Sequence, residues 1–261
     1  MRRIATTLFA ALALTAVLAA SASAAPKPTI VLVHGAWADG SSWSRVAHRL
    51  QDRGYTVDVA PNPLRSVAGD AAYLKAILAT ISGPIVLVGH SYGGAVITNA
   101  AVGNANVKAL VYVDAFIPDQ GESVIQLVGA RPGSALAANP TDVFNFVPYP
   151  GAPAGDVDLY LKPRVFVRAF GNDLPKAEAK VFAASQRPLT FSAGNEPSGP
   201  PAWKTIRSFA VVGTKDLVLP KAEQSFMARR ANSKITRLKA GHLSMVSHPK
   251  AVTKVIVRAA R

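Results

Sequence analysis

The chain has 261 residues, 49% of them hydrophobic and 17% charged, and it contains no cysteine. That length suits one domain with a sizeable core, and the lack of cysteine excludes a fold held together by disulfides. The formal net charge is +14. Because the basic residues are scattered, with no run of four and no interleaved aromatic residues, they indicate a basic surface and do not favour nucleic-acid binding.

The first 24 residues have the pattern of a secretory signal peptide. A basic head at 1–3 precedes an apolar, alanine-rich stretch at 4–20, and Ala-Ser-Ala at 22–24 is an A-x-A cleavage site. We expect cleavage after Ala24, in preference to Ala25, and a secreted or periplasmic mature domain at 25–261 with a charge of about +12. An uncleaved membrane anchor is disfavoured because the apolar stretch is short, and no later segment is suited to stable membrane insertion.

Short apolar runs alternate with helical patterns along most of the mature chain, which predicts an α/β fold. Strands are expected at 29–33, 55–60, 84–88, 109–113, 208–212 and 234–238. Helices are expected at about 41–53, 67–81, 91–101, 220–231 and 249–260. This alternation predicts a mostly parallel, doubly wound sheet of about six strands, with helices on both faces.

The alternation is interrupted at about 119–203. This segment is rich in proline and glycine and shows no regular succession of strands and helices. We interpret it as a cap inserted over the sheet. Within it, Asp173 is expected to cap a helix that begins at Leu174.

A nucleophile elbow is predicted at Gly89-His90-Ser91-Tyr92-Gly93, between an apolar strand and a helix rich in small residues. The two glycines remove side chains that would collide as the strand and the helix close up around Ser91. The start of the helix also directs N–H groups toward a negative charge forming on a substrate. The competing interpretation is a glycine-rich turn with a solvated serine.

A serine nucleophile needs a base, and that base needs an orienting carboxylate. His242 follows the last predicted strand and is the histidine whose position suits a base. Asp216 follows the strand before it, so the order along the chain is Ser91, Asp216, His242, which is the order of α/β-hydrolases. Asp114, at the end of the strand after the elbow, is the alternative acid.

The chain resembles the α/β-hydrolases, and in particular the small cofactor-free members that include esterases and hydroxynitrile lyases. The motifs that carry the resemblance are His34-Gly35-Ala36-Trp37, Gly89–Gly94, Gly213-Thr214-Lys215-Asp216 and Gly241-His242. The resemblance implies an oxyanion hole made by the backbone N–H groups of Ala36 and Tyr92, with Trp37 as the substitute for Ala36 if the loop is wound differently.

The resemblance implies a serine hydrolase, with a carboxylesterase acting on small or medium esters as the first hypothesis. Trp37 and Phe116 are possible walls of the substrate pocket. No metal-ligand spacing, P-loop or dinucleotide-binding glycine pattern occurs in the sequence, so we expect no metal and no cofactor. The expected partner is a small-molecule ester, and the sequence does not predict an oligomeric state.

Two other functions fit the same motifs. A hydroxynitrile lyase would use the same three residues for proton transfer and would need a lysine to stabilise cyanide, for which Lys239 is the nearest in sequence to His242. A non-catalytic binding protein could share the fold but has no need of a serine, a histidine and an aspartate in this order.

Overall fold

The computed structural model describes residues 26–261, and the predicted signal peptide at 1–24 therefore lies outside the described residues. Six parallel strands form the main sheet in the order β2-β1-β3-β4-β8-β9. They are β1 (Thr29–Val33), β2 (Val57–Ala60), β3 (Ile85–His90), β4 (Val107–Val113), β8 (Ser208–Gly213) and β9 (Lys234–Leu238). The predicted doubly wound α/β sheet of six strands is confirmed.

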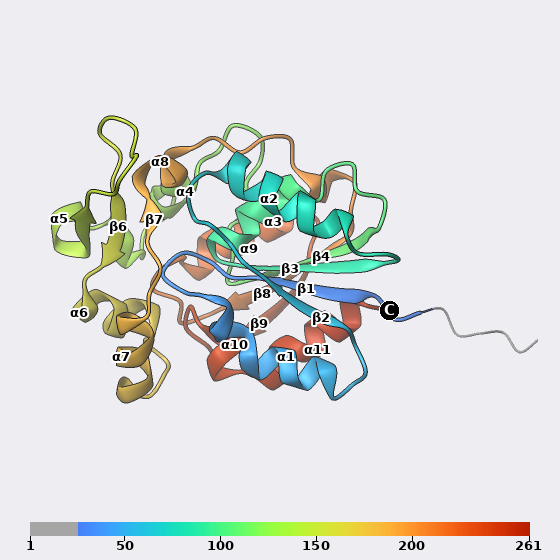
Figure 1. Ribbon diagram of the computed structural model, residues 1–261. Coiled ribbons are helices and arrows are strands. Elements are labelled where there is room, and N and C mark those ends of the chain that lie inside the picture. The colour runs from blue at the N-terminus through green and yellow to red at the C-terminus, as the bar shows by residue number, and fades with distance from the viewer. Residues whose placement is uncertain (1–25) are drawn as a thin grey trace, which may run out of the picture.

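Helices cover both faces of this sheet (Figure 1). α1 (Ser44–Gln51) and α11 (Pro249–Ala259) lie on one face, and α2 (Val67–Ala79), α3 (Tyr92–Ala100) and α9 (Lys221–Arg230) lie on the other. Because both faces are covered, the central strands are continuous apolar runs, and every residue of β3 is buried. Within residues 26–261, no helix is both long enough and apolar enough to cross a membrane.

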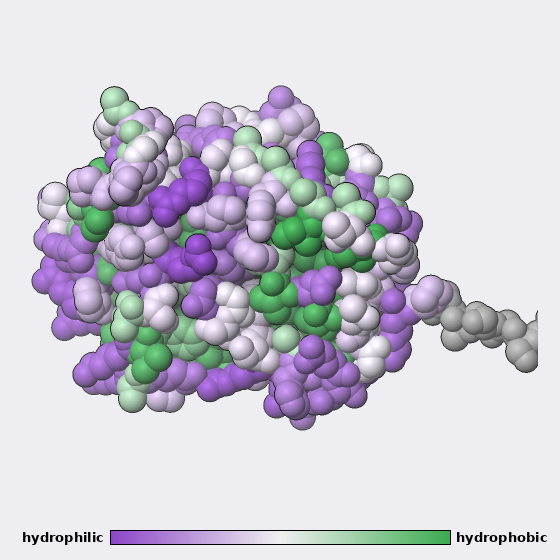
Figure 2. All heavy atoms as spheres, in the orientation of Figure 1, coloured by the Kyte–Doolittle hydropathy of each residue, from purple (hydrophilic) through white to green (hydrophobic). Residues whose placement is uncertain are grey.

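The outer surface differs from this core. On the face drawn in Figure 2, hydrophilic side chains cover most of the protein and apolar side chains form separate patches between them. The buried side chains of the strands and the facing helices instead form one continuous hydrophobic core.

Between β4 and β8 the chain leaves the main sheet and forms a second, smaller one. This segment, which we call the cap segment (residues 119–203), contains three antiparallel strands in the order β5-β6-β7. The strands are β5 (Phe144–Val147), β6 (Asp158–Leu161) and β7 (Leu189–Thr190). Short helices surround them: α4 (Val124–Gly129), α5 (Pro140–Val143), α6 (Pro163–Val165), the π-helix η3 (Phe166–Phe170), α7 (Lys176–Ala184) and α8 (Phe191–Asn195).

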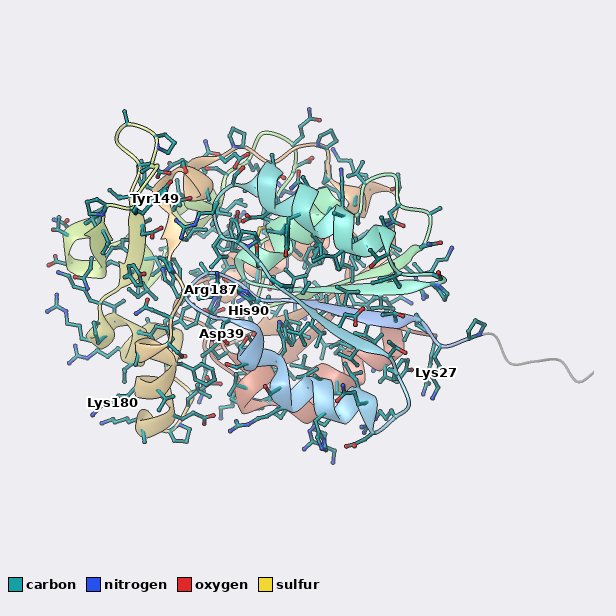
Figure 3. The ribbon with its side chains drawn as sticks, viewed as in Figure 1. Lys27, Asp39, His90, Tyr149, Lys180 and Arg187 are labelled. Atoms are coloured by element: carbon teal, nitrogen blue, oxygen red, sulfur yellow. The ribbon has the colours of Figure 1, made fainter. Side chains whose placement is uncertain are left out.

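The cap segment lies beside the main sheet, at the left of Figure 1. The indole Nε1 of Trp37, which follows β1, donates a hydrogen bond to the carbonyl of Leu159 in β6 at 2.8 Å. The Trp37 backbone N–H donates to the carbonyl of Arg187, also in the cap segment, at 2.9 Å. Arg187 is labelled in Figure 3, at the side of the main sheet that faces the cap segment. The cap segment therefore rests on the loop after β1.

One predicted helix start was wrong. Helix α7 begins at Lys176 and not at Leu174, because the proline at 175 disfavours helical backbone at the residue before it. Asp173 does not cap this helix, and its carboxylate binds the loop after β9 instead. The first helical segment, predicted at about 41–53, starts with a 3₁₀ turn, Gly40–Trp43, which is capped by Asp39.

The glycines around Ser91 are required by close contacts. A Cβ on Gly89 would lie 2.5 Å from the carbonyl oxygen of Gly93, and a Cβ on Gly93 would lie 2.7 Å from that of Val33. Gly89 therefore allows β3 and α3 to approach each other, and Gly93 allows α3 to approach the end of β1.

We predict that Gly89→Ala lowers the free energy of unfolding of the mature chain by about 2 kcal/mol or more, because backbone atoms would have to move to admit the methyl group. Urea unfolding at pH 7 measures this change. Gly129→Ala is the matched control, since its Cβ would meet nothing within 4 Å, and we expect no loss of stability there. A Gly89→Ala variant as stable as the wild type would contradict the prediction.

Candidate functional site

Ser91 occupies the turn between β3 and α3. β3 ends at His90, α3 begins at Tyr92, and Ser91 between them has φ 50° and ψ −124°. A residue with a side chain adopts such a left-handed backbone only where the surrounding contacts enforce it. Here the contacts of Gly89 and Gly93 enforce it, so the Ser91 side chain has a fixed position at the end of the sheet.

A chain of hydrogen bonds connects Ser91, His242 and Asp216. His242 Nδ1 lies 2.7 Å from Asp216 Oδ2, and His242 Nε2 lies 2.9 Å from Ser91 Oγ. Because the carboxylate can only accept, the proton of the neutral imidazole sits on Nδ1, and Nε2 is left to accept the Ser91 hydroxyl. All three side chains are buried, with Ser91 only 1% exposed and His242 fully buried.

Asp216 is held in place by other donors as well as by His242. Its Oδ1 accepts from the backbone N–H groups of Val218 at 2.8 Å and Leu219 at 2.9 Å, and its Oδ2 accepts from Gln224 Nε2 at 2.8 Å. Burial raises its pKa well above the ordinary value, whereas these donors favour the charged form. The donors also fix the orientation of the carboxylate that His242 meets.

Asp114, the alternative acid, is buried nearby but makes no hydrogen bond to His242. Its Oδ2 accepts from the Ser244 N–H at 3.3 Å, and its Oδ1 has no partner among the described residues. Burial raises its pKa well above the ordinary value, and the charge of Asp216 raises it further. Since Asp216 has far more donors, we assign the negative charge to Asp216 and a proton to Asp114.

The imidazole of His242 is surrounded by rings and by buried backbone. The ring of Phe170, in η3, and the ring of His90 each have their centroids 4.9 Å from that of His242. Burial lowers the pKa of His242 below its ordinary value, so the imidazole is neutral at neutral pH. His242 can therefore act as a proton acceptor there.

The loop after β1 lies directly against Ser91. A Cβ on Gly35 would be 2.6 Å from the Ser91 Cβ. His34 fixes this loop: its Nδ1 donates to the Gly35 carbonyl at 2.9 Å, and its Nε2 accepts from the Asn62 N–H at 3.3 Å. Burial lowers the pKa of His34 and so favours the neutral imidazole, which can donate through one ring nitrogen and accept through the other.

The two predicted oxyanion donors, Ala36 and Tyr92, have backbone N–H groups without a protein acceptor within residues 26–261. That of Ala36 has no partner among the described residues, and that of Tyr92 is the first N–H of α3, which a helix leaves without an internal partner. Trp37 N–H is already bonded to Arg187 in the cap segment. Within the described part of the chain, Ala36 thus has an N–H group free to bind an oxyanion and Trp37 does not, and the assignment of Ala36 and Tyr92 as the oxyanion hole stays a prediction.

Trp37 and Phe116, the possible pocket walls, are both buried close to these loops. The Trp37 ring stacks on Phe144 at 5.7 Å and meets Phe170 edge-on at 6.0 Å, so it lies between the main sheet and the cap segment. Phe116 follows β4, and its N–H donates to the Ser91 carbonyl at 3.2 Å. Among residues 26–261, no group of three or more His, Asp or Glu side chains is arranged to hold a metal ion.

The sequence did not indicate Phe170, Asn172 or Asp173 as site residues. They come from a part of the cap segment without a periodic pattern, and their partners are distant in sequence. Asn172 Nδ2 donates to the carbonyl of Lys215 at 2.8 Å, and Asp173 Oδ2 accepts from the N–H of Gly241 at 2.7 Å. The only local signal is the glycine at 241, where a Cβ would collide with Asn172.

Comparison with known proteins defines the class. The sequence profile of the alpha/beta hydrolase family matches residues 30–255. This match spans nearly the whole described chain, so the protein belongs to the α/β-hydrolase family and is an enzyme of that family.

The individual proteins similar to this chain share only a modest sequence identity with it. The carbendazim hydrolyzing esterase of Nocardioides sp. is 35% identical over 114 residues, which cover 38% of this chain and 46% of that enzyme. The pyrethroid hydrolase of Sphingobium wenxiniae is 27% identical over 246 residues, covering 87% and 85% of the two chains. The crystal structure of polyneuridine aldehyde esterase superimposes with a TM-score of 0.77 over 90% of this chain and 100% of its own, at 17% identity, which shows the shared fold.

Proposed function

We propose that the protein is a serine carboxylesterase that acts on small or medium esters. The observation that carries the proposal is the continuous hydrogen-bond chain from Ser91 through His242 to Asp216, next to the backbone N–H groups of Ala36 and Tyr92. A nucleophile, a base, an orienting acid and two oxyanion donors are the groups that acyl transfer needs.

In this mechanism Ser91 Oγ attacks the ester carbonyl carbon while His242 Nε2 takes the hydroxyl proton. The Ala36 and Tyr92 N–H groups bind the oxyanion, and one such donor is typically worth about 3 kcal/mol of transition-state stabilisation. The imidazolium, stabilised by Asp216, gives its proton to the departing alcohol and leaves an acyl-serine. Water, deprotonated by His242, then attacks the acyl carbon, and the acid is released as Ser91 regains its proton.

The surroundings of Ser91 support an uncharged substrate. Buried aromatic side chains lie beside the hydrogen-bond chain, because Phe170 packs on His242 and Trp37 packs on Phe170. Burying a charged substrate group among such side chains would be costly without a partner. Esterase relatives that act on carbendazim and pyrethroids are consistent with a neutral ester as the substrate class.

Hydroxynitrile-lyase chemistry on the same residues is less well supported. It would need a cation close to the reacting carbon, and Lys239, the lysine nearest to His242 in sequence, is exposed at the surface while Ser91 and His242 are buried. Release of cyanide from mandelonitrile by the wild-type protein, with no hydrolysis of p-nitrophenyl acetate, would favour that chemistry over the ester hydrolysis that we propose.

We also propose that the chain is exported and that the mature enzyme begins at Ala25, on the strength of the basic head, the apolar stretch and the A-x-A site at 22–24. N-terminal sequencing of the exported protein should start at Ala25. Recovery of the activity only inside the cells, on a chain that still carries residues 1–24, would refute this.

Replacement of Ser91 by alanine should reduce turnover of p-nitrophenyl acetate by more than about 10³-fold, because no nucleophile remains to form the acyl-enzyme. A fluorophosphonate probe should label the wild type at Ser91 and leave Ser91→Ala unlabelled. Ser185→Ala, on an exposed serine of the cap segment, is the control and should behave as the wild type. An unlabelled wild type would point to a non-catalytic binding protein.

The two buried aspartates should respond differently to the same substitution. Asp216→Asn replaces the acceptor of His242 Nδ1 by an amide that can present a donor, so we expect kcat to fall by about 10³- to 10⁴-fold. Asp114→Asn keeps a neutral group where we assign a proton, and kcat should stay within about 10-fold of the wild type. Steady-state kinetics on p-nitrophenyl acetate measures both, and the reverse ranking would make Asp114 the acid.

A further inference from the structure

One turn of the cap segment holds the loops that carry both Asp216 and His242. The turn is Asn172-Asp173, between η3 and α7. Asn172 Nδ2 donates to the carbonyl of Lys215, the residue before Asp216, at 2.8 Å. Asp173 Oδ2 accepts from the N–H of Gly241, the residue before His242, at 2.7 Å. Each side chain of the turn thus fixes the backbone next to one member of the acid–base pair.

The contact of Asp173 extends beyond one hydrogen bond. Its Oδ2 also accepts from Ser247 Oγ at 2.7 Å, so the carboxylate connects the loop on which His242 lies to the helix that follows it, α10 (Ser244–Ser247). Its Oδ1 is buried with no partner among the described residues. Gly241 makes the approach possible, because a Cβ there would lie 2.8 Å from Asp173 Oδ1 and would collide with Asn172.

We propose that Asn172 and Asp173 are positioning residues through which the cap segment aligns His242 with Ser91 and Asp216, and that the Asp173 carboxylate favours the imidazolium form of His242 during the reaction. This proposal rests on the esterase function proposed above. Asn172 and Asp173 do not touch the reacting atoms in this mechanism and act through the backbone of Lys215 and Gly241.

Among residues 26–261, few basic groups lie close to the carboxylate of Asp173. Its side chain is only 12% exposed, and the nearest basic group is His248, whose Nδ1 lies 3.9 Å from its Oδ2. A negative charge there favours the imidazolium and so raises the pKa of His242, against the larger lowering by burial. The titratable or charged groups that face this region from the packed elements are Asp114, Asp216, His90, His248 and Arg45.

The test is the pH dependence of kcat/KM for p-nitrophenyl acetate in the mature chain. Asp173→Asn should lower the plateau of kcat by about 10-fold or more while KM changes by less than about 3-fold, because alignment and not substrate binding is lost. The midpoint of the acidic limb should move down by roughly half a pH unit or more, since the imidazole becomes harder to protonate without the neighbouring charge.

Matched variants separate charge from alignment. Asn172→Ala removes a hydrogen bond and no charge. We therefore expect kcat to fall and the pH midpoint of the acidic limb to remain that of the wild type. Asp173→Glu keeps the charge, and its limb should stay close to that of the wild type. His248→Gln leaves the charge of Asp173 in place and should not reproduce the downward shift. Asp142→Asn removes an exposed carboxylate of the cap segment, 68% exposed, and should change neither kcat nor the limb.

Nuclear magnetic resonance of labelled histidines reads the same effect without turnover. The His242 imidazole, assigned by its loss in His242→Gln, should titrate at lower pH in Asp173→Asn than in the wild type. If Asp173→Asn does not fold by circular dichroism, Asp173→Ser serves as the second neutral variant with the same expected shift.

An unmoved His242 titration and an unmoved acidic limb in the neutral variants would overturn the proposal, whatever the loss of kcat, because a purely structural contact would leave both in place. A wild type that the fluorophosphonate probe does not label would instead overturn the esterase function, and the histidine titration would still report on Asp173.

Discussion

The hydrogen bond between His242 and Asp216 is the interaction on which the site depends, and it forms where almost no water reaches. Burial alone would push the carboxyl of Asp216 toward its neutral form. The N–H groups of Val218 and Leu219 and the amide of Gln224 counter this by solvating the charge within the protein. Those donors come from the loop after β8 and from α9, so the first turn of that helix has to be in place before His242 has a partner.

The sheet brings the remaining groups together through its strand order. β1 lies second from one edge of the sheet; from it the chain runs outward to β2 at that edge and returns to β3 on the other side of β1, which leaves the ends of β1 and β3 adjacent. Gly35 and Ala36 extend from one end and Ser91 from the other. The backbone of Gly35 lies so close to Ser91 that a side chain at position 35 would collide with it. The loop that carries the predicted oxyanion donor Ala36 is therefore packed directly against the predicted nucleophile.

The sequence predicted the parts of the structure that depend on local patterns. The inner strands β1, β3, β4 and β8 are buried almost throughout and read as apolar runs, and the elbow around Ser91 needs glycines at fixed offsets. The choice between Asp216 and Asp114 could not be made from the sequence, because both follow strands and only the donors around them in space distinguish the two. Asp173 was assigned to its own helix, since Gly241 and Ser247 lie 68 and 74 residues further along the chain. The antiparallel sheet of the cap segment was missed because its strands have only two to four residues each.

The turn at Asn172-Asp173 also bears on how such an enzyme can diversify. In a fold whose insertion only covers the substrate, one insertion could be exchanged for another and the chemistry would survive. Here the same insertion holds the backbone beside both Asp216 and His242. A change of the insertion is therefore expected to change the substrate range and the catalytic rate together. If the cap segment of another protein were grafted onto this sheet, it would have to supply an amide and a carboxylate at this turn. Without them, we expect the chimeric enzyme to be slower as well as altered in substrate range.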